Sequence, residues 1–181
     1  MPRNSFIQMS KLTNVLGRIT YISSKAKQEN LYATYTTIPE RCFWRELSKC
    51  NQESFRQSGT EGKCIEAREL IIALPESFVH YEPEYLLKRF TDHFKQKYKV
   101  ECISALHHNK RKTNYHIHLI FAERQLLDKP IEKIATRNMF YDELGKHRRT
   151  KKEILDEAGN IRKKCKVIKK GEMYERNLFT K

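Results

Sequence analysis

The stretch YHIHLIF, from Tyr115 to Phe121, decides how this chain of 181 residues folds and what it can bind. It predicts a β-strand, in which successive side chains point to opposite faces of a sheet. His116 and His118 therefore share one face, while the apolar residues that alternate with them point into a core on the other. Two imidazoles at i and i+2 on one face are well placed to share a cation.

A third histidine comes from the segment just before this strand. Residues 100–107 form another β-rich run, and the polar stretch 108–114 between the two runs predicts a hairpin loop. If the strands pair across that loop, His107 or His108 lies beside the first two histidines. Three neutral nitrogen ligands that leave coordination positions open are typical of a catalytic metal site. The alternative is that the histidine pair lies by chance on a solvated strand face.

Further along the chain in both directions, strands and helices alternate. Residues 67–74 are apolar and stop at Pro75, which is typical of a buried strand. Pro39 and Pro83 each begin a predicted helix. The buried face of the second helix repeats every four residues, at Leu86, Phe90, Phe94 and Tyr98.

Two segments are harder to assign. Residues 14–25 have apolar residues at helical spacing, but Gly17 weakens the helix prediction. Residues 156–160 predict a turn, and residues 161–168 a strand after it, with a basic disordered tail as the alternative. We expect an α+β fold with a mostly antiparallel central sheet flanked by helices, in a single domain over residues 1–181.

The composition narrows the class of protein. Lys and Arg number 36 against 22 Asp and Glu, a net charge of +14, which suggests a polyanionic partner, usually nucleic acid and sometimes an anionic membrane. No apolar run approaches the ~20 residues of a membrane span, and the N-terminus lacks the apolar core of a secretory signal. We therefore expect a cytoplasmic protein.

Five cysteines without a C-x-x-C pair predict reduced thiols, neither a disulfide framework nor a zinc site.

At this point the sequence resembles a known family. Ala105-Leu106-His107, a short loop and then residues 114–119 resemble the three-histidine motif of the MobA/MobL plasmid mobilisation relaxases, which are HUH endonucleases; the family often has Pro where this chain has Tyr115. Residues 67–75 are similar to the family's acidic strand ending in Ala-Leu-Pro. Tyr21-Ile22 resembles the family's nucleophile segment. The resemblance runs from about Gly17 to Arg124.

The resemblance implies an HUH relaxase-like fold and a strand-transfer activity. Such an enzyme nicks one strand of supercoiled plasmid or transposon DNA at a transfer origin, stays attached to the 5′ phosphate through a tyrosine, and later rejoins the ends. Its partners would be single-stranded or supercoiled origin-of-transfer DNA and accessory relaxosome proteins, in the bacterial cytoplasm. Relaxases of this type carry further domains, so we expect an N-terminal fragment of a longer protein or a minimal form.

The resemblance also suggests roles for individual residues. His107, preferred to His108 because it follows Ala-Leu as in the family, would hold Mn²⁺ or Mg²⁺ with His116 and His118. Tyr21 would attack phosphorus, with Tyr32, Tyr35 or a histidine as rival nucleophiles. Glu69 would orient a histidine or accept the tyrosine proton, unless it is a strand-edge glutamate in solvent. The basic residues expected to contact phosphates are Lys110, Arg111, Lys112, Arg148, Arg149, Lys151 and Lys152.

Two other classes of function fit the sequence. A non-catalytic nucleic-acid-binding domain would use the histidines structurally and would not cleave. A metal-dependent phosphodiesterase that uses water would cleave without a protein–DNA adduct.

Overall fold

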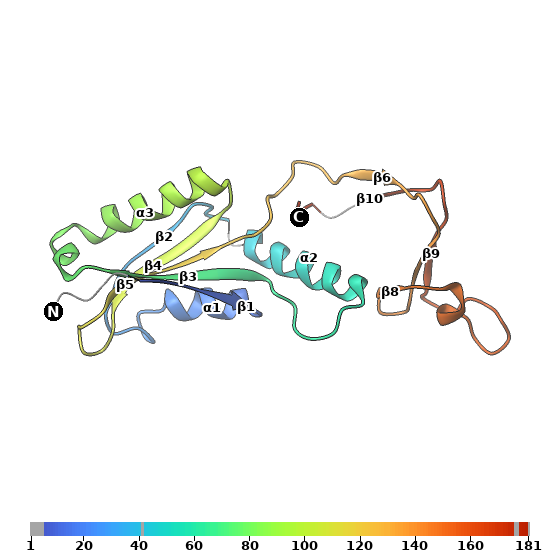
Figure 1. The fold of residues 1–181 in the computed structure, drawn as a ribbon, viewed down its shortest axis with the longest axis horizontal. Helices are drawn as coiled ribbons and strands as arrows, with labels where there is room; N and C mark the ends of the chain where they lie inside the picture. The colour runs from blue at the N-terminus through green and yellow to red at the C-terminus, as the bar shows by residue number, and fades with distance from the viewer. Residues whose placement is uncertain (1–5, 41, 176–177, 181) are drawn as a thin grey trace. The chain divides into compact units, whose positions relative to one another are not determined.

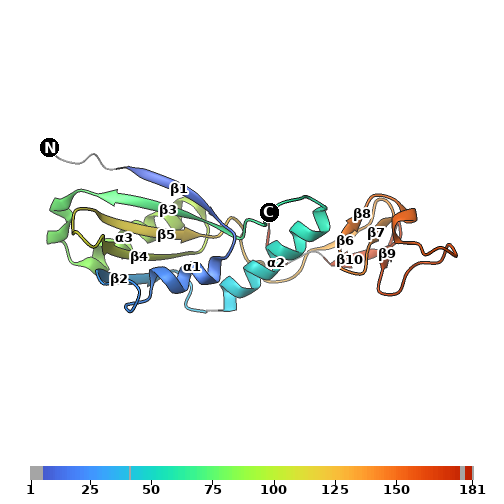
Figure 2. The same cartoon turned by 90° about the horizontal axis from the view of Figure 1, so that it is seen from below.

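Five strands of the computed structural model pair into one antiparallel sheet, in the order β1-β3-β5-β4-β2 (Figure 1). The strands are β1 (Ile7–Leu12), β2 (Leu31–Thr36), β3 (Ala67–Leu74), β4 (Cys102–His108) and β5 (Tyr115–Phe121). The structure describes residues 6–40, 42–175 and 178–180. Figure 2 shows β3, β5 and β4 running side by side through the middle of the sheet. The predicted α+β fold with an antiparallel central sheet is confirmed.

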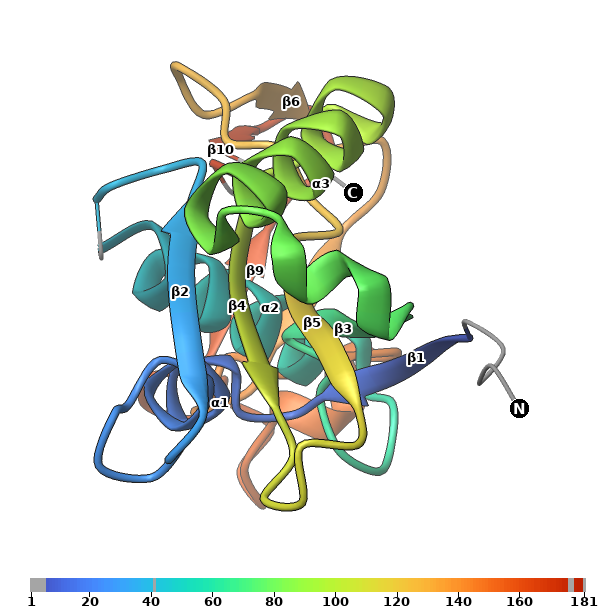
Figure 3. The ribbon, with the colours of Figure 1, turned by 90° about the vertical axis from the view of Figure 1, so that its left-hand side faces the viewer.

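The two faces of the sheet carry different helices. Figure 3 shows α3 (Pro83–Tyr98) over one face and α1 (Val15–Ile22) on the other. A hydrophobic core fills the α3 side, because the alternate residues of β4 and β5 point there. Its central buried members are Leu74, Leu86, Leu87, Leu106, Tyr115, Ile117 and Leu119. The histidine side chains of β5 therefore lie on the face of α1, as the alternation predicts.

Helix α3 begins at Pro83, as predicted, but its buried face differs in one position. Glu82 caps the first turn by accepting hydrogen bonds from the backbone N–H groups of Glu84 and Tyr85. The prediction that Tyr98 belongs to the buried face is wrong, because its side chain is 55% exposed. A four-residue repeat drifts ~40° per step on a helix of 3.6 residues per turn. The last member has therefore rotated off the sheet, and Leu87 is fully buried instead.

The buried Leu87 side chain provides a test of this core. Leu87→Ala removes three carbons from a site that solvent does not reach. We expect the free energy of unfolding to fall by about 2–5 kcal/mol, because the cavity adds to the lost burial. Chemical denaturation followed by circular dichroism measures the change. The exposed Leu16 gives a matched control, and Leu16→Ala should cost far less; equal losses would contradict this description of the core.

The ambiguous segment 14–25 forms helix α1, and two contacts position it. The Asn14 side chain accepts a hydrogen bond from the backbone N–H of Gly17 at 2.9 Å. Glycine leaves room for this cap, since a Cβ would lie 2.7 Å from the Asn14 amide nitrogen and displace the side chain. The Glu66 carboxylate, just before β3, accepts from the backbone N–H of Val15 at 2.8 Å. These contacts fix the start of α1 beside the start of β3.

The hairpin between β4 and β5 has the predicted form. His107 lies opposite His116, and His108 opposite Tyr115. Asn109 closes the loop through its side chain, which accepts from the backbone N–H of Thr113 at 2.8 Å. The register therefore places His107 on the same face as His116, next to it.

The chain divides into two compact units, and the sheet belongs to the first. The first unit comprises the described residues of Met1–Ser48 and Ile65–Gln125, and the second those of Lys49–Cys64 and Leu126–Thr180. Helix α2 (Cys42–Ser58) begins in the first unit and ends in the second. A functional domain can contain two compact units, so one relaxase domain over residues 1–181 stays a prediction.

The second unit is built from short strands. A two-stranded sheet pairs β6 (Glu132–Ile134) with β10 (Met173–Glu175), and a three-stranded sheet has the order β8-β7-β9. The strands of the three-stranded sheet are β7 (Met139–Tyr141), β8 (His147–Arg148) and β9 (Lys166–Ile168). Two short 3-10 helices, η1 (Glu76–His80) in the first unit and η2 (Lys151–Ile154) in the second, complete the elements.

The basic segment is structured, although less regularly than predicted. The turn at 156–160 is present, with a hydrogen bond from the backbone N–H of Asp156 to the carbonyl of Asn160 at 2.8 Å. The strand predicted for residues 161–168 is largely wrong, because only Lys166–Ile168 forms one. A second turn interrupts it, with Lys164 at a positive φ of 69°. No helix formed by the described residues is long and apolar enough to cross a membrane.

Candidate metal centre

Three histidines of the central sheet lie together on the face of α1. His107 comes from β4, and His116 and His118 come from β5. All three residues are largely buried, and one nitrogen from each lies within 4.8 Å of the others. The group that the sequence predicts is therefore assembled by the pairing of two neighbouring strands.

His108, the alternative third histidine, points to the other face. Its ring packs against Tyr115, with the centroids 4.7 Å apart. Tyr115 belongs to the core under α3. His108 is thus directed away from the cluster of His107, His116 and His118.

Hydrogen bonds set the tautomers of two of these rings. Nδ1 of His116 lies 2.9 Å from the backbone carbonyl oxygen of Asn114, and Nδ1 of His118 lies 2.7 Å from Oε1 of Glu69. Both oxygens are acceptors, so both Nδ1 atoms carry the proton and each Nε2 keeps a lone pair. These two Nε2 atoms face each other at 3.2 Å. Two lone pairs at that distance repel each other unless a proton or a metal ion lies between them.

The third ring adds another unused nitrogen. Nε2 of His107 is buried and has no hydrogen-bond partner among the residues that the structure describes. A buried nitrogen without a partner is costly in a core, but it is what a metal ligand requires. The donor set of three imidazole nitrogens therefore fits a divalent metal ion.

The protonation states agree with this interpretation. Burial, and after it the neighbouring His118 and His116, lower the pKa of His107 to about 3. Burial also lowers the pKa of His116. Both rings are consequently neutral at physiological pH, the form in which imidazole binds a metal.

Glu69 lies behind His118 as the second layer of the site. It is on β3, an interior strand, and only 2% of its surface is exposed, so the alternative of a strand-edge glutamate in solvent is wrong. Burial raises the pKa of this carboxyl, but hydrogen bonds from His118 and Arg18 outweigh that effect and leave the pKa below its usual value. Glu69 is therefore an ionised acceptor that orients His118.

Arg18, on α1, connects this carboxylate to Tyr21. Its Nε lies 3.1 and 3.0 Å from the two carboxylate oxygens of Glu69, and its Nη2 lies 3.4 Å from Nδ1 of His118. The guanidinium carbon lies 5.3 Å from the centroid of the Tyr21 ring. Tyr21 is 44% exposed, one side chain away from the cluster. Sequence reasoning missed Arg18, although its position three residues before Tyr21, one helical turn away, could have suggested it.

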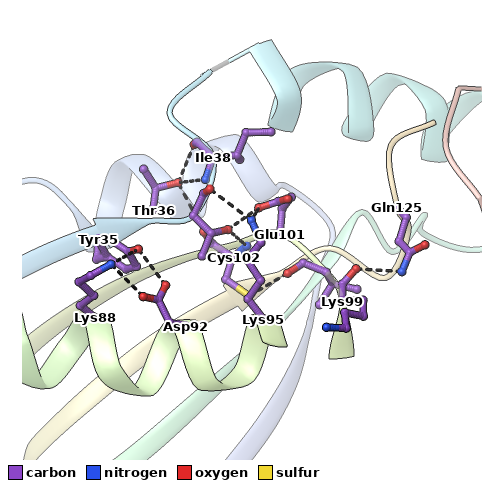
Figure 4. Close-up of polar contacts among 12 residues, drawn as sticks. Tyr35, Thr36, Ile38, Lys88, Asp92, Lys95, Lys99, Glu101, Cys102 and Gln125 are labelled. Atoms are coloured by element: carbon purple, nitrogen blue, oxygen red, sulfur yellow. Dashed lines mark hydrogen bonds and ion pairs between the residues drawn. The ribbon is translucent and has the colours of Figure 1, made fainter. Parts of the chain in front are cut away.

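The two rival tyrosines are directed elsewhere. The Tyr35 hydroxyl donates to Asp92 of α3 at 2.8 Å and accepts from Lys88 at 3.0 Å, as Figure 4 shows. The Tyr32 ring packs edge-on against Tyr115, with the centroids 5.7 Å apart. Both contacts lie on the α3 side of the sheet, so Tyr21 is the candidate nucleophile that shares a neighbour with the histidines.

The predicted DNA-binding residues divide between the two units. Lys110, Arg111 and Lys112 are exposed on the hairpin loop of the first unit. Arg149, Lys151 and Lys152 are exposed in the second unit. Arg148 differs, because its guanidinium pairs with the buried Asp142 at 2.8 Å. That pair ties β8 to the turn that Asp142 closes by accepting from two backbone N–H groups.

Comparison with known proteins gives one family. The model of the MobA/MobL family matches residues 26–177, a range that includes Glu69 and the three histidines and begins after Tyr21. No curated protein matches the chain. Since the family model covers most of the chain, the protein belongs to the MobA/MobL family, and with it to the mobilisation proteins.

Proposed function

We propose that the protein is a DNA relaxase, an endonuclease and strand transferase that nicks one strand at a transfer origin and stays covalently attached through Tyr21. The observation that carries this proposal is the convergence of three imidazole nitrogens beside Arg18, which in turn contacts the exposed Tyr21 on α1. Family membership supports it, because the MobA/MobL family is generally related to relaxases. Origin-of-transfer DNA, single-stranded or supercoiled, would be the substrate, with accessory relaxosome proteins as partners in the bacterial cytoplasm.

His107, His116 and His118 would hold the metal, Mn²⁺ or Mg²⁺. When bound, the ion supplies positive charge that stabilises the negative charge developing on the phosphate oxygens. Glu69 keeps the His118 ring in one tautomer and orientation, and the Asn114 carbonyl does the same for His116. Because the protein fixes these rings before substrate arrives, little reorganisation is needed during the reaction.

Tyr21 would supply the nucleophile. Its hydroxyl oxygen forms a bond to phosphorus while the bond from phosphorus to the 3′ oxygen breaks. The phenolic proton passes to water, which reaches this half-exposed side chain, and the 3′ oxygen takes a proton from water. The 5′-phosphotyrosyl diester retains a transferable phosphoryl group, so the reverse reaction rejoins the strand.

Exposed basic residues would hold the DNA backbone. Counterion release makes such binding fall with salt, with a log–log slope of about −0.7 per phosphate contact on a single strand. Replacing Lys110, Arg111 and Lys112 together by Gln should therefore flatten the slope by about 2. Fluorescence anisotropy with a single-stranded oligonucleotide at several salt concentrations measures this.

The matched control replaces three exposed basic residues of α3, which covers the face of the sheet away from the histidines. The triple change of Lys88, Arg89 and Lys97 to Gln removes the same charge and should leave most of the slope. The set Arg149, Lys151 and Lys152 tests the second unit in the same way. If wild type and the loop variant have the same salt dependence of affinity, the hairpin loop does not contact the DNA backbone.

One experiment tests the proposed function as a whole. The protein is incubated with single-stranded DNA carrying its origin sequence and Mn²⁺ or Mg²⁺, and the mixture is denatured and run on a gel. A covalent protein–DNA band that chelator prevents is the expected result. Cleavage without the band would favour a water-using phosphodiesterase, and binding without cleavage would favour a non-catalytic binding domain.

A further inference from the structure

Arg18 has more hydrogen-bonding capacity than its visible contacts use. Its Nε and Nη2 are engaged by Glu69, with Nη2 at 3.0 Å from Oε1. Among the described residues, Nη1 has no hydrogen-bond partner, and 28% of the side chain is exposed. A guanidinium has five N–H donors in a rigid plane. One edge of Arg18 is therefore fixed by the protein, and the other is free to bind an acceptor.

The surroundings of that free edge indicate what kind of acceptor it would receive. Nη2 lies 3.4 Å from Nδ1 of His118, and the guanidinium carbon lies over the ring of Tyr21 at 5.3 Å. The arginine thus contacts both a candidate metal ligand and the candidate nucleophile. A phosphate positioned for attack by Tyr21 beside the histidines would have its oxygens near this edge.

Charge gives a second reason for an arginine at this place. The Glu69 carboxylate is buried and lies 2.7 Å from His118 and 3.0 Å from Arg18, so without the arginine its negative charge would repel an incoming phosphodiester. Arg18 offsets that charge. A planar guanidinium can also bind two phosphate oxygens at once, which a lysine ammonium does not do with the same geometry.

We propose that Arg18 binds the scissile phosphodiester directly, with its Nη1 edge donating to the non-bridging oxygens while Glu69 holds its Nε edge. This inference rests on the proposed function, since it takes the histidine face as the place where DNA is cut. It makes Arg18 a catalytic residue that supplies fixed positive charge beside the histidines.

The test uses a substrate with a single phosphate charge. Thymidylyl-(3′→5′)-thymidine has one phosphodiester, and its methylphosphonate counterpart is neutral at the same linkage. Binding of each is followed by NMR titration of the Mg²⁺-loaded Tyr21→Phe protein, which keeps the aromatic ring under Arg18 and cannot be modified. We expect the charged dinucleotide to bind about tenfold more tightly than the neutral one, the size of one charge-assisted hydrogen bond.

The variant Arg18→Lys keeps a positive charge next to Glu69 but loses the planar guanidinium that can bind two phosphate oxygens at once. It should remove most of the preference for the charged dinucleotide and leave the affinity for the neutral one unchanged. Mg²⁺ affinity should also stay within about threefold of the parent, because the histidines are intact. Arg89→Lys is the matched control: Arg89 lies on α3, donates to the Tyr85 hydroxyl at 3.2 Å, and should leave the preference unchanged.

A retained preference in Arg18→Lys would overturn the inference, and so would a parent protein that does not distinguish the two dinucleotides. If Arg18→Lys does not fold by thermal melting, Arg18→Gln takes its place with the same expected loss. The adduct assay reports separately on the proposed function. If the wild-type protein forms the adduct but Arg18→Lys keeps the preference for the charged dinucleotide, the phosphate-binding role of Arg18 is refuted and the relaxase proposal stands. If Arg18→Lys loses that preference but the wild-type protein forms no adduct, the relaxase proposal is refuted and the phosphate site stands.

Discussion

Replacing Tyr21 by phenylalanine is expected to abolish DNA cleavage and the covalent protein–DNA complex together. The change removes only the hydroxyl from a half-exposed side chain, so the packing of α1 and the contact with Arg18 are kept. Without the phenolic oxygen the proposed nucleophile is lost, and the rate should fall by at least ~10³-fold. A denaturing gel of labelled origin DNA measures both products, while calorimetry checks that metal affinity is unchanged.

Three other tyrosines are controls for this result. Tyr32→Phe, Tyr35→Phe and Tyr85→Phe should keep most of the activity, because these rings contact residues on the α3 side of the sheet or on α3 itself. Mass spectrometry of the trapped complex then locates the nucleotide. An adduct on any residue other than Tyr21 would leave the proposed enzyme class intact and refute the nucleophile.

Replacing His116 by alanine should eliminate cleavage through loss of the metal. Its Nε2 faces Nε2 of His118 at 3.2 Å, and removing it leaves two ligands from a set of three. We expect Mn²⁺ affinity to fall by more than the ~10–100-fold that loss of an outer-shell partner costs. Isothermal calorimetry of the metal-free protein gives the affinity, and anisotropy should show that DNA binding largely survives.

His108→Ala is the control for this change. It removes a buried histidine from the same hairpin, but one that packs against Tyr115 on the other face. It should leave Mn²⁺ affinity within a few-fold of wild type even though it lowers stability. If His116→Ala binds Mn²⁺ as tightly as wild type does, the histidine cluster is structural and the proposed mechanism is refuted.

The central sheet could be predicted from the sequence because its signals are local. The alternating residues predict β5, the polar loop before it predicts the hairpin, and the apolar run ending at Pro75 predicts β3. None of these signals requires knowledge of the rest of the chain. The same local reasoning wrongly predicted that Tyr98 is buried, because a four-residue repeat does not stay on one face of an α-helix. It also missed the turn that interrupts residues 161–168.

The candidate site could be predicted only in part, because its members come from different elements. The histidines follow from one hairpin, so periodicity and pairing were enough to bring them together. The distance between Glu69 and His118 depends on β3 pairing next to β5, which no local pattern specifies. Arg18 reaches the site because α1 packs on that particular face of the sheet, which is a tertiary fact. Tyr21 was found through resemblance alone, and its role stays a prediction.

The facing pair of His107 and His116 also determines which changes of length the chain can accept. Extra residues at 109–114 only enlarge a surface loop, and doubling its length costs roughly 0.6 kcal/mol in closure entropy. One extra residue between Leu106 and His107 is different, because Leu106 is held in the core and His107 would turn toward α3. Over evolutionary time, insertions should therefore accumulate at the tip of this hairpin, while its two strands keep a constant length.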